Sequence, residues 1–74
     1  MSVKNGIHLL DVVALTKDLP RRKLRRGQVG TVVEQLDPNV FEVEFSDNEG
    51  RTYATLALPA NSLLVLHHQL VHAA

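Results

Sequence analysis

Val40-Phe41-Glu42-Val43-Glu44-Phe45 is the stretch of sequence that decides the fold. Apolar and acidic residues alternate through it with a period of two, which is the pattern of a β-strand with one face in a core. Glu42 and Glu44 are predicted to face water, and the buried face is predicted to hold Phe41, Val43 and Phe45. Turn-forming residues bound the stretch, with Asp37-Pro38-Asn39 before it and Asp47 to Gly50 after it. The pattern therefore predicts a strand that is entered and left through tight turns.

Four further strands are predicted around this one, spaced about 10 residues apart. Runs of β-branched and other apolar residues place them at 11–15, 27–36, 51–58 and 63–66. In the third of these, Tyr53 and Thr55 are predicted on one face, and the other face is predicted to hold Ala54, Leu56 and Leu58. The segment from Pro59 to Ser62 predicts a single 3₁₀ turn before the last strand.

Short strands separated by turn signals predict an all-β fold rather than βαβ units. The predicted architecture is a small five-stranded SH3-like barrel over residues 1–67, followed by a C-terminal tail over residues 68–74. Closure of such a barrel hides strand edges that would otherwise pair with other chains. Between the first two strands, from Thr16 to Arg26, the sequence predicts a long polar loop.

The chain has 74 residues, which is enough for one hydrophobic core and not for two. It contains no cysteine, so no disulfide can stabilise this small domain. Oligomerisation is the remaining way to bury more surface, and a homodimer is therefore predicted. No apolar run has the length of a signal-peptide core or of a membrane span, which predicts a cytoplasmic protein without membrane contact.

The formal net charge is zero, yet the charges are segregated along the chain. Six of the eight basic residues lie between Lys17 and Arg26, and six of the eight acidic residues lie between Glu34 and Glu49. This order predicts a basic loop followed by an acidic hairpin, and such opposed charges suit docking to a complementary partner. The predicted partner-binding residues are Arg21, Arg22, Lys23, Arg25, Arg26 and Tyr53.

Several blocks of this sequence resemble a bacterial family, in the family's order. The blocks are LDVVAL at 10–15, DLP at 18–20, LRRGQVGTVVE at 24–34, FEVEFSD at 41–47, GRTY at 50–53 and LLVL at 63–66. They are similar to short proteins catalogued as domain of unknown function 4926. The resemblance implies an SH3-like barrel in a bacterial protein, with no assigned biochemistry, and it suggests the product of an adjacent gene as a protein partner.

The Gly-Gln-Val-Gly-Thr-Val segment at 27–32 is also similar to the glycine-bearing strand of the KOW motif. That similarity implies RNA or ribosome binding, with the basic loop on phosphates and Tyr53 as a platform for stacking. The simpler interpretation is that the glycines serve a bent strand and that the loop charges are only solvated. The zero net charge and the acidic hairpin favour the simpler interpretation, because carboxylates repel a phosphate backbone.

Other activities find little support among the residues present. Proline-rich peptides and methyl-lysine both need aromatic-lined sites, and this chain has no tryptophan and one tyrosine. His67, His68 and His72 lack a carboxylate ligand in the tail, so neither a metal site nor any other cofactor is predicted. No enzyme activity is predicted either, because the sequence lacks a cysteine, a nucleophile elbow and a glycine loop that leads into a helix.

The predicted function is therefore a non-catalytic protein–protein interaction module, with an antitoxin, an immunity protein or an accessory subunit as its candidate roles. The alternative is a KOW-like RNA- or ribosome-binding module that uses the same residues. Retention on RNA that weakens as salt rises distinguishes the two functions.

Overall fold

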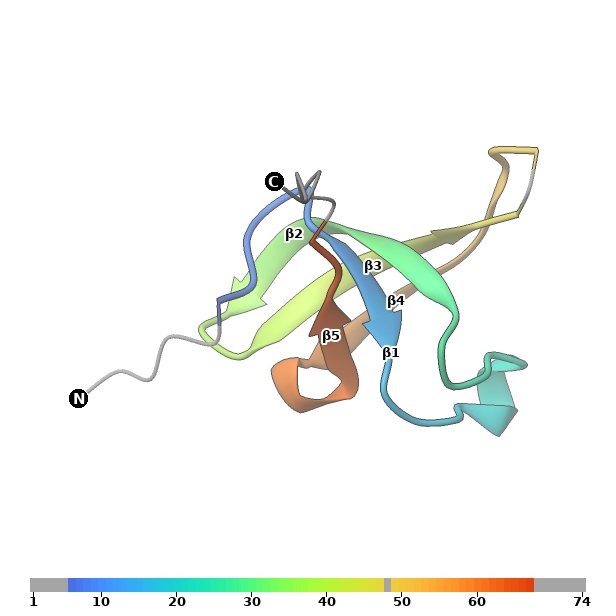
Figure 1. The fold of residues 1–74 in the computed structure, drawn as a ribbon, viewed down its shortest axis with the longest axis horizontal. Helices are drawn as coiled ribbons and strands as arrows, with labels where there is room; N and C mark the ends of the chain where they lie inside the picture. The colour runs from blue at the N-terminus through green and yellow to red at the C-terminus, as the bar shows by residue number, and fades with distance from the viewer. Residues whose placement is uncertain (1–5, 48, 68–74) are drawn as a thin grey trace, which may run out of the picture.

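The computed structural model describes residues 6–47 and 49–67. Five antiparallel strands form one sheet in the order β4-β3-β2-β1-β5 (Figure 1). The strands are β1 at Val12–Leu15, β2 at Val29–Asp37, β3 at Val40–Ser46, β4 at Thr52–Pro59 and β5 at Leu63–Val65. The 3₁₀ turns are η1 at Pro20–Arg22 and η2 at Ala60–Ser62. The prediction of an all-β fold with five strands is confirmed, and the tail at 68–74 lies outside the described residues.

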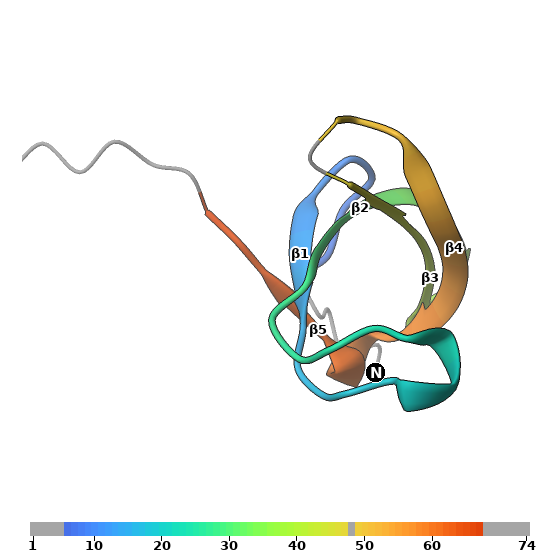
Figure 2. The same cartoon turned by 90° about the vertical axis from the view of Figure 1, so that its right-hand side faces the viewer.

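The sheet curls around its core without closing (Figure 2). β4 and β5 are its two edges, and among the described residues no ladder joins them. The sequence predicts a closed barrel with hidden edges, and in this respect the prediction needs correction. β5 has three residues and follows η2 directly, which leaves too little extended chain for a ladder to β4. The outer edge of β4 therefore has no partner strand within residues 6–47 and 49–67.

The inner face of β3 lies at the centre of the core. Phe41, Val43 and Phe45 are each 0% exposed, which confirms the alternation predicted for this strand. Glu42 and Glu44 lie on the opposite face, where they are half-buried rather than fully exposed. The two glutamates are half-buried because β3 is paired on both sides, so that the neighbouring strands cover part of each side chain.

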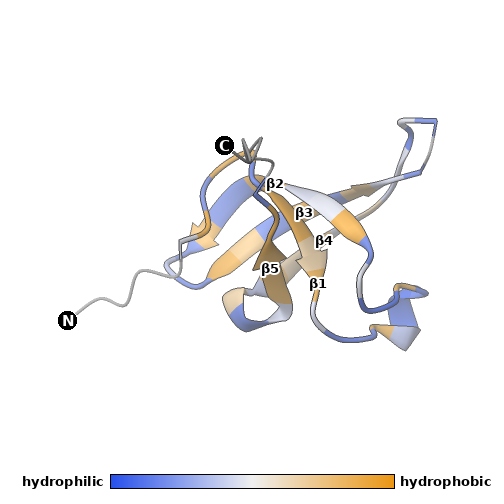
Figure 3. Cartoon of the chain, in the orientation of Figure 1, coloured by the Kyte–Doolittle hydropathy of each residue, from blue (hydrophilic) through white to orange (hydrophobic). Residues whose placement is uncertain are grey.

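Residues from the other strands and from the connecting loops complete the core. Val32 of β2 and Leu56 of β4 are both in register with Val43, one from each side. The other large apolar members are Ile7, Val13, Leu15, Leu24, Leu58 and Leu63. On β4, Ala54 is half-buried and Tyr53 and Thr55 are exposed, as the alternation predicts. In Figure 3 hydrophobic colour follows β1 and β5, and hydrophilic colour covers much of the loop that carries η1.

β2 passes unusually close to β3 at Gly30, which is buried. A Cβ at this position would lie 2.7 Å from Cγ1 of Val43 and 2.9 Å from the carbonyl oxygen of Glu44. Both distances are shorter than van der Waals contact, so only glycine fits between the two strands. Packing thus explains one of the two glycines in the KOW-like segment, and the similarity to the KOW motif itself stays a prediction.

The start of β2 and the turn η1 differ from the sequence predictions, and the other strand bounds agree with them to within one residue. β2 begins at Val29, because Gly27 has a φ of 92° and belongs to the preceding turn. The turn η1 lies where the sequence predicts only a polar loop, whereas η2 confirms the 3₁₀ turn predicted at 59–62. None of the helical segments in the described ranges has the length and hydropathy needed to cross a membrane.

Truncation of the central aromatic side chains tests the packing of β3. Phe41→Ala or Phe45→Ala is expected to lower the free energy of unfolding by about 3–5 kcal/mol, because each leaves a cavity in a fully buried site. Chemical denaturation measures this loss, with Thr55→Ala on the exposed face as a control that changes it by about 0.5 kcal/mol or less. An unchanged melting temperature in both phenylalanine variants would contradict this arrangement of β3.

The close approach of β2 to β3 is tested by adding a single methyl group. Gly30→Ala is expected to destabilise the fold by about 1–3 kcal/mol, because the new Cβ overlaps Val43 and the Glu44 carbonyl. In a double-mutant cycle, Gly30→Ala with Val43→Ala is expected to cost less than the sum of the single changes. Additive losses would contradict a direct contact between the two positions.

Candidate functional site

The basic loop, residues 16–26, is a folded element tied to the core. A bridge between Leu19 and Leu24 closes its base, with backbone hydrogen bonds of 2.8 and 3.2 Å. Leu24 is 1% exposed and packs in the core, while η1 forms the turn between the two leucines. Lys23, after η1, has a φ of 58°, a left-handed conformation that costs a residue with a side chain about 1–2 kcal/mol. The contacts of Leu24 hold the loop in this conformation.

Side-chain hydrogen bonds fasten the end of the loop that leads into β2. Oδ1 of Asp18 accepts from the backbone N–H of Arg26 at 2.8 Å. Oε1 of Gln28 accepts from the backbone N–H of Arg25 at 2.5 Å, and its Nε2 donates to the Tyr53 hydroxyl at 2.7 Å. Gln28 thus links the loop to Tyr53, a contact that the sequence alone does not predict. No local pattern signals this contact, since it joins residues 25 positions apart.

The five cations predicted to bind a partner are all exposed: Arg21, Arg22, Lys23, Arg25 and Arg26. Within the described ranges none of them forms an ion pair, whereas Arg51 contacts both Asp47 and Glu49. Their positive charges are therefore not neutralised by carboxylates of the described chain. A negatively charged partner can reach them without displacing an internal salt bridge.

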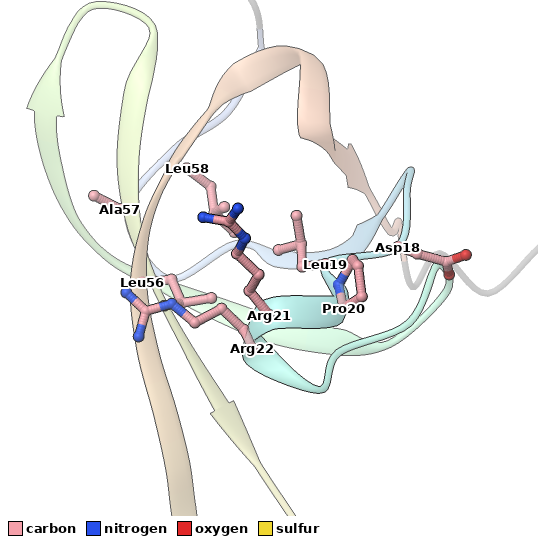
Figure 4. A pocket seen from close by; sticks show the side chains of 8 residues that line it. All are labelled: Asp18, Leu19, Pro20, Arg21, Arg22, Leu56, Ala57 and Leu58. Carbon is pink, nitrogen blue, oxygen red and sulfur yellow. The ribbon is translucent and has the colours of Figure 1, made fainter.

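A groove of about 540 Å³, here called the β4 groove, runs between η1 and the edge strand β4. Figure 4 shows the side chains of Arg21 and Arg22 extending from η1 toward β4. The residues that line the groove are Asp18, Leu19, Pro20, Arg21, Arg22, Leu56, Ala57 and Leu58. The floor is thus mainly apolar, and two guanidinium groups stand beside it.

The other predicted site residues lie around this groove rather than in it. Lys23 and Arg25 line a neighbouring hollow of about 600 Å³ that shares Asp18 and Pro20 with the β4 groove. Tyr53 lines a third hollow beside Gln28 and Val29. The fold therefore gathers four of the five cations on two sides of η1, whereas Arg26 lines neither hollow and Tyr53 lies beside the end of the loop that leads into β2.

Four of the six acidic residues of the hairpin form two groups with different surroundings. Glu34 and Glu42 are direct cross-strand partners of β2 and β3, an arrangement in which like charges repel each other. Asp47 and Glu49 instead lie in the β3–β4 turn, where the Arg51 side chain contacts them at 3.2 and 2.8 Å. The first group, like Asp37 and Glu44, therefore presents negative charge without an internal cation among the described residues. One part of the predicted acidic hairpin thus lies on a face of the sheet. The other part lies in a turn, where Arg51 neutralises its negative charge.

The predicted histidine cluster falls largely outside the described residues. His67 is exposed, and His68 and His72 belong to the segment that is not described. Among the described residues, no three histidine, aspartate or glutamate side chains come close enough together to hold a metal ion.

Comparison with known protein families gives a match. A family model described as "Domain of unknown function (DUF4926)" matches residues 9–65. No curated protein and no solved structure matches the chain. The match confirms the family resemblance predicted from the sequence blocks, and it spans all five strands together with the basic loop.

The turn that carries Asp47 predicts a pH-dependent stability. The pKa of Asp47 is lowered, chiefly because the backbone N–H of Arg51 donates to its carboxylate, and the backbone N–H of Glu49 and the Arg51 side chain add to this effect. A lowered folded-state pKa contributes stability above the unfolded pKa of about 3.9, and this contribution is lost as pH falls through the folded value.

Asp47→Asn is therefore expected to lower the melting temperature near pH 7, with a difference from the unmodified chain that shrinks below about pH 4. Thermal unfolding across this pH range measures the difference. Asp37→Asn, at the end of β2, is the matched control, because that carboxylate accepts no hydrogen bond from the described residues. A difference for Asp47→Asn that stays constant down to pH 2 would contradict the assignment.

Proposed function

Because the chain belongs to the DUF4926 family, whose function is unknown, we propose from the geometry of the basic loop that it is a non-catalytic protein-interaction module. Its partner presents carboxylates to Arg21, Arg22, Lys23, Arg25 and Arg26. In this role the chain serves as an accessory, antitoxin or immunity subunit for a second protein. The product of an adjacent gene is the first partner to test.

One observation carries this proposal: the cations have no internal carboxylate partners in the described ranges, and they stand on a loop that is fixed to the core. Leu24 anchors the loop, and the hydrogen bonds of Asp18 and Gln28 fasten its end. A loop that is already ordered loses little conformational entropy on binding, so more of the interaction energy remains as affinity. Guanidinium groups also suit planar, bidentate contacts with carboxylates.

The distribution of charge supports a protein partner over RNA. Glu34, Glu42 and Glu44 occupy the outer sheet face, and they would repel a phosphate backbone that runs along the sheet. Opposed patches on one small domain fix the orientation of a protein partner, because a wrong orientation brings like charges together. The buried Gly30 also has a packing role, so the KOW-like segment can be accounted for without RNA.

Charge reversal tests the proposal. Co-expression with the product of the adjacent gene, followed by co-purification and titration, is expected to show a complex whose affinity falls as salt rises. Arg22→Glu with Arg25→Glu is expected to weaken it about tenfold or more, equivalent to at least about 1.4 kcal/mol. Lys17→Glu, an exposed cation that lines neither hollow beside η1, is the matched control.

Circular dichroism first establishes that each variant keeps the fold. Unchanged partner affinity in the double variant would overturn the assignment of the basic loop. Retention of the unmodified chain on RNA at low salt, lost in the double variant, would instead support the RNA-binding function.

A further inference from the structure

β4 is a long sheet edge that carries little protection against pairing. Edge strands are usually guarded by charged residues, proline, bulges or a covering segment. β4 contains no charged residue from Thr52 to Pro59, and its bulge and its proline lie at its two ends. The stretch between them, Thr55 to Leu58, has none of these devices. The other edge, β5, has three residues only and offers much less backbone.

The hydrogen-bond register identifies the backbone groups of β4 that point outward. Val40 and Pro59 are cross-strand partners, and the N–H of Ala60 donates to the carbonyl of Asn39 at 2.8 Å. Asn39 and Ala60 are the chain neighbours of Val40 and Pro59. In an antiparallel ladder, a hydrogen bond between such neighbours means that the enclosed pair, Val40 and Pro59, is not itself hydrogen-bonded. Leu58 and Leu56 therefore bond to β3, and the alternate residues of β4 turn their backbone groups away from it.

Ala57 and Thr55 consequently direct their N–H and C=O groups to the open side of the sheet. Pro59 follows the same alternation, so that its missing N–H falls on the side where the sheet needs no donor. Within the described ranges, no backbone hydrogen bond joins the basic loop to β4. Two donors and two acceptors are thus available for one more strand.

The β4 groove lies along this edge. Ala57 lines it and is exposed, and the apolar side chains of Leu19, Leu56 and Leu58 line it as well. Arg21 and Arg22 stand across from β4, and Figure 4 shows their side chains reaching toward it. Asp18 is the one carboxylate of the groove, and Oδ1 of its side chain already accepts from the Arg26 backbone. A ligand at this edge therefore meets both unpaired backbone and positive charge.

The same two arginines disfavour a second copy of the chain as the occupant. An antiparallel β4–β4 pair centred on Ala57 would bring Arg21 and Arg22 of both copies to one junction, where four positive charges repel. An extended acidic segment has the opposite relation to the groove, since its carboxylates neutralise the guanidinium groups. Alternate side chains of a strand point the same way, so every second residue of such a segment would face the arginines.

We infer that the edge of β4 is a strand-addition site for an extended acidic segment of the partner protein. The segment pairs with the backbone of Thr55 and Ala57, and its alternate carboxylates bind Arg21 and Arg22. This inference rests on the proposed function, since it names the partner's recognition element at the same loop. Backbone pairing supplies affinity, and the arginines select acidic sequences.

A synthetic probe separates strand addition from simple charge attraction. The probe is a capped hexapeptide of alternating glutamate and valine, and two further versions carry N-methyl groups, either on the glutamate amides or on the valine amides. Only one edge of an added strand pairs with β4, so one methylated version is expected to bind at least tenfold more weakly while the other stays within about twofold. Charge attraction alone would leave the two versions equal.

Backbone amide resonances report the place of binding. The amides of Thr55 and Ala57 are expected to show the largest shifts and to exchange more slowly with solvent when the peptide is bound. Ala57→Pro is expected to abolish these effects and to keep the fold, because the N–H of Ala57 does not bond to β3. The double change Arg21→Gln with Arg22→Gln is expected to lower the affinity for the peptide at least tenfold. Lys17→Gln is the matched control.

Several outcomes overturn the inference. Equal affinity of the two methylated peptides, or the absence of shifts at Thr55 and Ala57 at millimolar peptide, excludes strand addition. In the free protein, the same two amides could instead be protected from exchange to a degree that increases with protein concentration. That result would assign the edge to a second copy of the chain. A partner complex that is lost in the Arg22/Arg25 reversal yet unaffected by Ala57→Pro would leave the proposed function standing and remove the strand-addition site alone.

Discussion

The packing of Phe41, Val43 and Phe45 between two neighbouring strands is the contact on which the rest of the structure depends. All three are fully buried, and β2 and β4 pair with β3 on either side of them. Gly30 belongs to the same contact, because the absence of a side chain lets β2 approach Val43 and the carbonyl of Glu44 closely. The curled sheet, which includes β1 and β5, provides the inner surface against which Leu24 packs.

The candidate binding surface follows from this core. Leu24 reaches the core from the base of the basic loop, and the charged residues on either side of it, Lys23 and Arg25, are exposed. The loop then lies beside β4 and forms the β4 groove. This surface is anchored because Leu24 is buried in the core. Its cations are unpaired because they contact no carboxylate of the described chain.

The open sheet gives the proposed function a structural element to act through. A closed barrel would pair the edge of β4 internally, whereas three-residue β5 leaves that edge, beside two arginines, without a partner strand in the part of the chain that the structure describes. Positive charge near an exposed edge has two effects at once. It opposes pairing with a second copy of the same chain, and it favours an acidic strand from another protein.

The sequence by itself determined the all-β class, the burial of Phe41 and Phe45, the turn at η2 and the family, because strand alternation and turn chemistry are local properties. Tertiary structure decided the rest. The open edge of β4 depends on which strands meet, the link from Gln28 to Tyr53 spans 25 positions, and the β4 groove joins residues 18–22 to 56–58. These features arise from contacts between distant parts of the chain, and no local pattern encodes them.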